Sequence, residues 1–307
     1  MNDRHPLVSV VIPVYNGEKT LMDTLAGVLK QTYPRFEIII VDDGSDCPVE
    51  SFVHPLLDDN RIRICRTERS NANVARNYGI RESKGEYIAM LDADDCWTES
   101  HLQDCLTLLR ESGADGLYGS LFLRRSLSDD IQQLPVFHAR EPDEDESMVD
   151  YLLTTGYGAQ TSTLFTTACS MKDILWDPEL IDHQDYDFVV RFRKKYRMTV
   201  KKEPAVIYYL SSGRQPDYIT GIRFVEENRK DIAPEIYTRY SLNMFIKAGM
   251  KEESKKFAGY FQKEATRYKH CISYQQYISI LNPTNRFREW VLKWRFLFYI
   301  LRIKTEL

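Results

Sequence analysis

The chain has 307 residues, of which 43% are hydrophobic and 28% charged, with 14 glycines and 12 prolines. This composition is that of a globular protein, and it excludes collagen-like, low-complexity and wholly disordered classes. The 41 basic and 45 acidic residues give a net charge of −4. That balance argues against a dedicated duplex-DNA binder, which normally carries a basic excess on one domain, so we expect no nucleic-acid partner.

The sequence carries no signal for export or for spanning a membrane. No stretch approaches the roughly 20 uninterrupted apolar residues of a spanning helix, and residues 1–13 lack the long apolar region of a secretory signal. The six cysteines are scattered without a CxxC pair, which argues against a zinc site or a dense disulfide framework. These features predict a cytoplasmic protein with reduced thiols.

The first hundred residues alternate apolar runs with amphipathic segments. A helix is expected from Leu21 to a point before Pro34, a second around residues 72–83, and a third capped by Thr98. This alternation of strand and helix predicts a right-handed, doubly wound α/β sheet. The expected strands cover residues 7–14, 36–41, 61–66 and 86–91.

Two acidic clusters follow buried strands of this expected sheet. Residues 42–46 (DDGSD) follow one strand, and residues 92–95 (DADD) follow another. Ligands bind beyond the carboxyl ends of the strands in such sheets. Like charges packed there repel each other unless a cation or a hydrogen-bonding ligand offsets them. The pattern therefore predicts a ligand site at this edge.

Four segments, in their order and spacing, resemble glycosyltransferase family 2, whose fold is GT-A, the nucleotide-diphospho-sugar transferase fold. The segments are VSVVIPVYNGEKTL, EIIIVDDGSD, NANVARNYGI and GEYIAMLDADDCW, and the later HQDYDF resembles the family's acceptor-side acidic motif. The resemblance covers roughly residues 6–210. It implies a mixed, mostly parallel sheet flanked by helices.

The resemblance also implies an activity and a division of the chain. The expected enzyme is an inverting transferase that moves a sugar from a nucleotide-diphosphate donor, with UDP favoured, to a glycan or lipid-linked acceptor in cell-surface polysaccharide synthesis. The expected catalytic domain covers residues 1–212, with a nucleotide-sugar half at about 6–125 and an acceptor half at about 126–212. Residues 213–307 form a helical extension, with helices expected at 224–249, 252–268 and from 283 onward.

A divalent cation is the expected cofactor. Loss of a nucleoside diphosphate leaves negative charge behind, which a bound cation stabilises. Mn²⁺ or Mg²⁺ suits carboxylate and phosphate oxygens and needs only one or two protein ligands. By resemblance, Asp94 coordinates the cation, Asp92 faces the ribose or the metal, and Ala93 belongs to the nucleotide-sugar site. The alternative is a turn with a helix cap, the role that we assign to Asp95.

The other donor-side residues follow from the same resemblance. Asp43 is expected to accept a hydrogen bond from a pyrimidine N–H, and its alternative is an Asx turn. Pro13 and Tyr15 are placed against the nucleobase, although Tyr15 could equally be a core residue. Glu18 is placed near the nucleotide, and Arg76 near ribose or diphosphate unless it is only a solvated or salt-bridged side chain.

Inversion requires a carboxylate that takes the proton of the attacking hydroxyl. Asp185 in HQDYDF matches the family's catalytic aspartate, whereas Gln184 replaces the glutamate that commonly precedes it. Asp187 is the rival base, and on a helix only one of the two aspartates can face a pocket. His183 could ligate a metal, but a lone histidine is more often a hydrogen-bonding surface residue.

Two further segments have open interpretations. The glycine-rich residues 156–162 lack phosphate-binding spacing and are expected to form a wall of the acceptor pocket, with Tyr157 and Trp176 either stacking on a sugar or packing in the core. Residues 286–307 are rich in aromatic and basic side chains. Such a helix either lies on an anionic membrane, at the inner face of the cell membrane, or packs on protein.

Two other functions compete with glycosyl transfer. A sugar-phosphate nucleotidyltransferase would normally show a glycine-rich loop with lysine or arginine after the first strand, and GEKTL is a poor match for it. A non-catalytic nucleotide-binding protein would have no need of Asp92, Asp94 and Asp185 together.

Overall fold

The computed structural model describes residues 5–267, apart from 57, 127, 211–215 and 250–254. The chain forms two compact units, Met1–Gln215 and Pro216–Leu307. The helix expected from residue 283 and the basic aromatic segment 286–307 lie outside the described residues.

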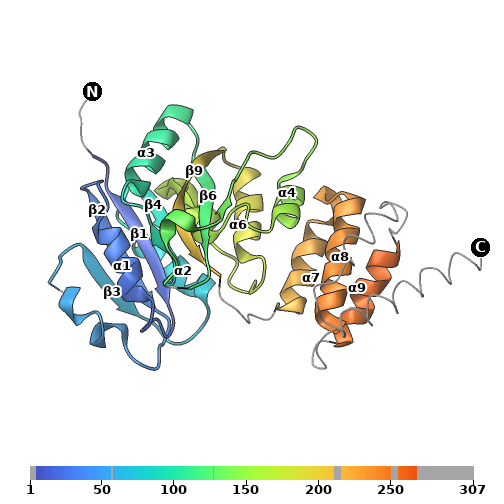
Figure 1. Ribbon diagram of the computed structural model, residues 1–307, viewed down its shortest axis with the longest axis horizontal. Coiled ribbons are helices and arrows are strands. Elements are labelled where there is room, and N and C mark those ends of the chain that lie inside the picture. Colours follow the sequence, from blue (N-terminus) through green and yellow to red (C-terminus); the bar gives the residue numbers. More distant parts are fainter. Residues whose placement is uncertain (1–4, 57, 127, 211–215, 250–254, 268–307) are drawn as a thin grey trace, which may run out of the picture. The chain divides into compact units, whose positions relative to one another are not determined.

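The first unit is built on one sheet, in which the strands follow the order β3-β2-β1-β4-β8-β6-β9-β5, with β7 paired to β6 (Figure 1). The four strands at one end of this order are parallel, and β8 is antiparallel to both of its neighbours. The strands are β1 (Val8–Val14), β2 (Phe36–Asp42), β3 (Ile62–Arg66), β4 (Tyr87–Met90), β5 (Cys96–Trp97), β6 (Gly116–Arg124), β7 (Val136–Phe137), β8 (Phe165–Thr167) and β9 (Met198–Tyr209). The expected α/β sheet, mixed and mainly parallel, is confirmed.

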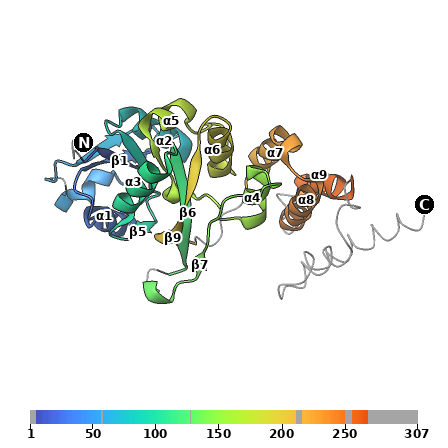
Figure 2. The ribbon, with the colours of Figure 1, turned by 90° about the horizontal axis from the view of Figure 1, so that it is seen from above.

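Helices cover both faces of this sheet (Figure 2). Helix α1 packs beside β5, and α3 packs beside β6 and β9. On the other face, α2 packs on β1 and β2, α5 packs beside α2, and α6 packs beside α5. The helices of the unit are α1 (Leu21–Leu29), α2 (Ala72–Glu82), α3 (His101–Ser112), α4 (Met148–Thr155), α5 (Ala168–Ile174) and α6 (Gln184–Arg193). Because both faces are covered, β1 is buried along its whole length, as its continuous apolar run predicts.

One detail of α3 differs from the expectation. The residue that caps its N-terminus is Ser100 rather than Thr98, and the Ser100 side chain makes no capping hydrogen bond. Thr98 instead accepts a hydrogen bond from the His101 N–H through its backbone carbonyl, one turn earlier. The expected buried face of Leu102, Cys105, Leu106 and Leu109 is confirmed.

The second unit is helical in its described part, with α7 (Tyr218–Glu227), α8 (Pro234–Gly249) and α9 (Lys255–Arg267). The single helix expected over residues 224–249 is wrong. Asn228 ends α7, a 3₁₀ turn at Arg229–Asp231 follows, and Pro234 begins α8. Proline is favoured at the first position of a helix and interrupts a helix interior, which explains the break. In the described residues no helix combines the length and apolarity needed to cross a membrane.

Helix α2 approaches the sheet through Gly79. A Cβ atom on this residue would lie 2.5 Å from Cγ1 of Val11 and 3.0 Å from Cγ2 of Val41. This close approach fixes the distance between α2 and the strands β1 and β2, and thereby the position of Arg76, one turn earlier on the same helix.

We expect Gly79→Ala to lower the free energy of unfolding by about 1 kcal/mol or more, because overpacking of about 1–3 kcal/mol outweighs the better helix propensity of alanine. Gly27→Ala in α1 is the matched control, since its Cβ would meet Trp97 atoms only at 3.5 Å. Urea unfolding of both variants measures the difference. Equal stability of the two variants would contradict the close contact.

Candidate active site

The site lies at the carboxyl edge of the parallel strands. Strands β1, β2 and β4 run in the same direction, and Val14 of β1 is in register with Asp42 of β2. Tyr15, Asp43 and Asp92 each follow the end of one of these strands. The sheet therefore brings three of the expected site residues to one edge.

The DADD segment leaves β4 with its first three residues half-buried. Arg76 on α2 donates from Nη2 to Oδ1 of Asp92 at 2.7 Å and from Nη1 to Oδ1 of Asn73 at 2.9 Å. The Arg76 side chain is only 3% exposed, so its interpretation as a solvated surface residue is wrong. A buried guanidinium next to a carboxylate holds that carboxylate in one orientation. The carbonyl of Ala93 accepts a hydrogen bond from Oγ1 of Thr24 at 3.0 Å, which ties the segment to α1.

Asp95, the last residue of the segment, links it to two distant parts of the unit. Its Oδ2 accepts a hydrogen bond from Oγ of Ser162, and its Oδ1 accepts one from the Tyr209 N–H at 2.8 Å. Oγ of Ser162 in turn accepts a hydrogen bond from the Asp92 N–H at 3.0 Å. Burial, with the nearby charges of Asp94 and Asp92, raises the pKa of Asp95 well above its ordinary value. Asp95 is thus a buried anchor, in keeping with the structural role expected for it.

Asp185 lies in the first turn of α6 and is half-buried. Burial raises its pKa to about 6, although the positive charge of Arg76 acts in the opposite direction. The negative charge of Asp92 adds to the increase. The guanidinium that pairs with Asp92 is therefore also near the Asp185 carboxyl.

The rival base, Asp187, has a different environment. Its Oδ2 accepts hydrogen bonds from Nε and Nη2 of Arg191 at 2.8 and 2.6 Å, and the same guanidinium donates to the carbonyls of Ile174 and Leu175. Asp187 is 8% exposed. Its carboxylate is committed to an ion pair that anchors the end of α5, which favours Asp185 as the base.

His183 occupies the N-cap position of α6 in a left-handed conformation, with φ 58°. Its ring stacks on Tyr186 with centroids 5.3 Å apart. In the described part of the chain no three His, Cys, Asp or Glu side chains gather closely enough to hold a metal ion by themselves. The half-buried carboxylates of Asp92 and Asp94 still fit Mn²⁺ or Mg²⁺, because these ions take oxygen ligands and obtain most of them from substrate phosphates and water.

The aspartates after β2 have separate partners. Asp42 is fully buried and accepts hydrogen bonds from Ser45 N–H, Val49 N–H and Arg66, which is the structural role expected for it. Asp43, 2% exposed, accepts from Ser70 at Oδ1 and forms an ion pair with Arg69 at Oδ2.

The neighbouring residues of β1 and its following turn differ in exposure. The guanidinium carbon of Arg69 lies 3.5 Å from the ring centroid of Tyr15, and this ring is 45% exposed, so Tyr15 is not a core residue. Pro13 is buried in register with Val41, whereas Glu18 is exposed in the turn before α1.

Trp176, Asn77 and Tyr157 each have contacts within the fold. Trp176 is 2% exposed and stacks on Phe188 at 4.0 Å, so its interpretation as a sugar-stacking residue is wrong. Asn77 donates to the Trp176 carbonyl and accepts from its N–H, so its amide is used within the fold. Tyr157 is half-buried and contacts Phe137 and Tyr208.

Sequence reasoning missed Ser162, Arg69 and Tyr208. Ser162 lies in a run of small polar residues that gives no hint of burial, yet it is 1% exposed and bonds to both ends of the DADD segment. Tyr208 could have been found from the tyrosine pair that follows the short apolar run of residues 205–207. Arg69 has no comparable signal, since it lies in a polar loop.

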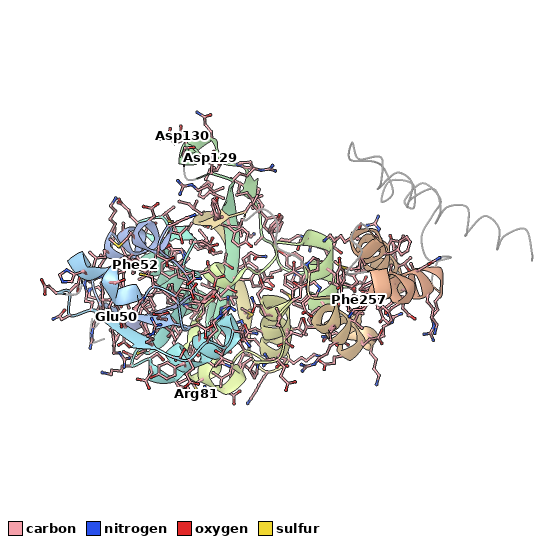
Figure 3. All side chains as sticks on the ribbon, turned by 90° about the horizontal axis from the view of Figure 1, so that it is seen from below. Glu50, Phe52, Arg81, Asp129, Asp130 and Phe257 are labelled. Carbon is pink, nitrogen blue, oxygen red and sulfur yellow. The ribbon has the colours of Figure 1, made fainter. Side chains whose placement is uncertain are left out.

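We expect Asp185 to titrate near pH 6, above the ordinary aspartate value of about 4, because burial disfavours its charged form. It is therefore protonated below this pH and ionised above it. Arg76→Gln should raise the pKa further, since the opposing positive charge is lost. Carbon-13 NMR of the side-chain carboxyls measures both values. Arg81→Gln, at the exposed end of the same helix (Figure 3), is the control that should leave the pKa unchanged.

An unshifted pKa for Asp185, or equal values in the Arg76 variant and the unmodified protein, would contradict this electrostatic arrangement.

Comparison with known proteins agrees with this geometry. Residues 9–175 match the family model described as glycosyl transferase family 2. The amylovoran biosynthesis glycosyltransferase AmsB of Erwinia amylovora is 31% identical over 209 residues, which cover 66% of this chain and 69% of AmsB. WfgD of Escherichia coli, a UDP-Glc:alpha-D-GlcNAc-diphosphoundecaprenol beta-1,3-glucosyltransferase, is 33% identical over 115 residues, 37% of this chain and 45% of WfgD.

The fold is similar to that of S. aureus TarS. One TarS crystal structure matches with a TM-score of 0.62 and 17% identity, over 88% of this chain and 50% of TarS. TarS residues 1–349 in complex with UDP-GlcNAc match with a TM-score of 0.55 and 17% identity, over 96% of this chain and 80% of that one. With a family model that spans more than half of the sequence and a relative of 31% identity, the chain belongs to glycosyl transferase family 2.

Proposed function

We propose that this protein is a metal-dependent inverting glycosyltransferase that transfers a sugar from a UDP-sugar to a glycan or lipid-linked acceptor in cell-surface polysaccharide synthesis. The observation that carries the proposal is the position of Arg76, which bonds to Asp92 and acts electrostatically on Asp185. One donor-side carboxylate, that of Asp92, and a half-buried carboxyl with a raised pKa, that of Asp185, lie near one guanidinium. These groups suit a reaction that releases an anionic leaving group and removes a proton from the attacking hydroxyl.

The nucleobase binds between β1 and β2 in this proposal. Tyr15 offers a partly exposed ring, on which Arg69 stacks through its guanidinium. A nucleobase that stacks on the Tyr15 ring displaces the Arg69 guanidinium, which stays nearby because it forms an ion pair with Asp43. A carboxylate has room for about four hydrogen bonds, so Asp43 can accept a pyrimidine N–H besides its present partners. Pro13 and Glu18 border this position.

Asp94 and Asp92 would hold Mn²⁺ or Mg²⁺ together with the diphosphate. When bound, the cation neutralises the negative charge that develops on the leaving diphosphate. The fixed Asp92 carboxylate, held by Arg76 and by the hydrogen bond from its N–H to Ser162, presents its oxygens in one orientation. Ala93 lies between the two carboxylates against the donor. Preorganised groups of this kind need no rearrangement during the reaction.

Asp185 is the proposed general base. Its pKa of about 6 places it as a carboxylate at neutral pH that is more basic than an ordinary aspartate, which favours proton transfer from the acceptor hydroxyl. The hydroxyl attacks the anomeric carbon on the side opposite the diphosphate, so the configuration inverts. Gln184 precedes Asp185 where a second acid is common. In this chain, therefore, a single carboxylate, that of Asp185, takes the proton.

The donor and the acceptor class rest on relatives. WfgD uses UDP-glucose as donor and alpha-D-GlcNAc-diphosphoundecaprenol as acceptor, and AmsB is a glycosyltransferase of amylovoran biosynthesis. The first unit, residues 1–215, contains every proposed site residue. We assign its nucleotide-sugar half to about residues 6–125. A lipid-linked acceptor would favour membrane contact by residues 286–307, at the inner face of the cell membrane, over packing on protein.

Asp185→Asn should lower the rate of UDP release from the donor by about 10²–10⁴-fold, because the variant removes the proton acceptor and keeps the shape of the side chain. Affinity for UDP should stay within about twofold, because this residue does not contact the nucleotide in our proposal. A coupled assay with several UDP-sugars measures the rate and calorimetry the affinity. Unchanged turnover in this variant would place the base elsewhere.

Asp94→Ala should abolish the increase in UDP affinity that Mn²⁺ produces, since it removes a ligand of the cation. Asp130→Ala, an equal change of charge on the exposed loop between β6 and β7 (Figure 3), is the matched control and should keep this increase. Calorimetry of UDP binding with and without Mn²⁺ measures the effect. Our metal assignment fails if the Asp94 variant still binds UDP more tightly with Mn²⁺.

A further inference from the structure

Three aromatic side chains form a cluster that the donor site does not use. The rings of Phe137 and Tyr157 are 5.8 Å apart at 57°, and those of Tyr157 and Tyr208 are 6.2 Å apart at 65°. All three side chains are half-buried. Phe137 and Tyr208 pack against the core of the unit, so Tyr157 rests with its ring against two fixed neighbours.

A glycine on each side of Tyr157 sets the backbone conformation of this turn. Gly156 ends α4 in a left-handed conformation, with φ 75°, which a side chain would strain. A Cβ on Gly158 would lie 2.5 Å from Cε1 of Tyr151 and 2.8 Å from Oγ1 of Thr155. Both glycines are therefore needed for the turn that carries Tyr157 away from α4.

The cluster adjoins the carboxylates of the active site. Burial raises the pKa of Tyr208, and the negative charges of Asp95, Asp185, Asp92 and Asp94 raise it further. Tyr186, next to Asp185 in the sequence, has a pKa raised by burial and by Asp185, Tyr208 and Tyr157 among its neighbours. The Tyr209 N–H, adjacent to Tyr208, bonds to Oδ1 of Asp95 at 2.8 Å, and Tyr186 directly follows Asp185 in the first turn of α6. The aromatic cluster therefore lies beside the DADD segment and near the proposed base.

We propose that Phe137, Tyr157 and Tyr208 bind the pyranose ring of the acceptor. The inference rests on the proposed glycosyl transfer and names the chemistry of its second substrate. A pyranose has C–H faces that pack on aromatic rings and hydroxyl groups at its edge, and binding sites combine apolar walls with a few polar groups in this way. A sugar bound at this cluster would lie near Asp185, the proposed base.

One observation favours the acceptor sugar over the donor sugar. Phe137 on β7, Tyr157 after α4 and Tyr208 on β9 all lie within residues 126–212, the half that we assign to the acceptor. Tyr157 also shares its segment with Ser162, which bonds to the Asp92 N–H and ties this half to the donor motif. Within residues 156–162, Ser162 thus contacts the donor motif, and Tyr157 belongs to the aromatic cluster.

The test uses the whole protein with UDP and Mg²⁺ and four probes: the methyl β-pyranosides of glucose, galactose, mannose and N-acetylglucosamine. Saturation-transfer NMR should show at least one probe bound through its ring C–H protons. Tyr157→Ala should weaken this binding about tenfold, the loss expected for one aromatic contact. Tyr157→Phe should bind within about twofold of the unmodified protein, because the ring remains.

Tyr78→Ala removes an exposed tyrosine, 39% accessible, from α2 and is the control that should bind the probe normally. UDP affinity, measured by calorimetry, should be equal in all these variants. The inference is overturned if no pyranoside binds, or if Tyr157→Ala binds the probes as well as the unmodified protein. It is also overturned if that variant loses affinity for UDP-glucose but not for UDP, since the cluster would then hold the donor sugar. A protein that binds no UDP would instead contradict the proposed function.

Discussion

The ion pair between the buried Arg76 and the half-buried Asp92 is the interaction on which the site depends. Asp92, Asp94, Asp95 and Asp185 act electrostatically on one another or on a common neighbour, Tyr208. Carboxylates gathered in this way repel each other and lose solvation, and an adjacent cation offsets both costs. Arg76 supplies that charge from α2, whose distance from the sheet is set by the contact of Gly79 with Val11 and Val41.

A second set of contacts joins the donor half to the acceptor half. Ser162 bonds to Asp92 and Asp95, and Asp95 bonds to Tyr209 at the end of β9. The metal-binding motif that we propose is therefore fixed by residues more than 60 positions away in sequence. A motif anchored on both sides keeps its geometry without a ligand, which is the condition for preorganised catalysis.

The sequence predicted the parallel half of the sheet well, because fully buried strands such as β1 and β2 appear as continuous apolar runs. It also predicted that Tyr15, Asp43 and Asp92 share one edge, since parallel strands end on the same side. It left open whether Trp176 is a core residue, and it did not predict that Asp187 pairs with Arg191, because both depend on how α5 and α6 pack. The contacts of Ser162 could not be predicted, since they join segments that only the folded chain brings together.

A crystal structure of the protein with UDP and Mn²⁺ would test the roles proposed for Asp94, Arg76 and Asp185 together. We expect the ion between the Asp94 carboxylate and the diphosphate, the Arg76 guanidinium still on Asp92, and the Asp185 carboxylate facing the far side of the space that the donor sugar fills. An ion bound away from Asp92 and Asp94, or a diphosphate lying between Asp185 and the aromatic cluster, would contradict these roles.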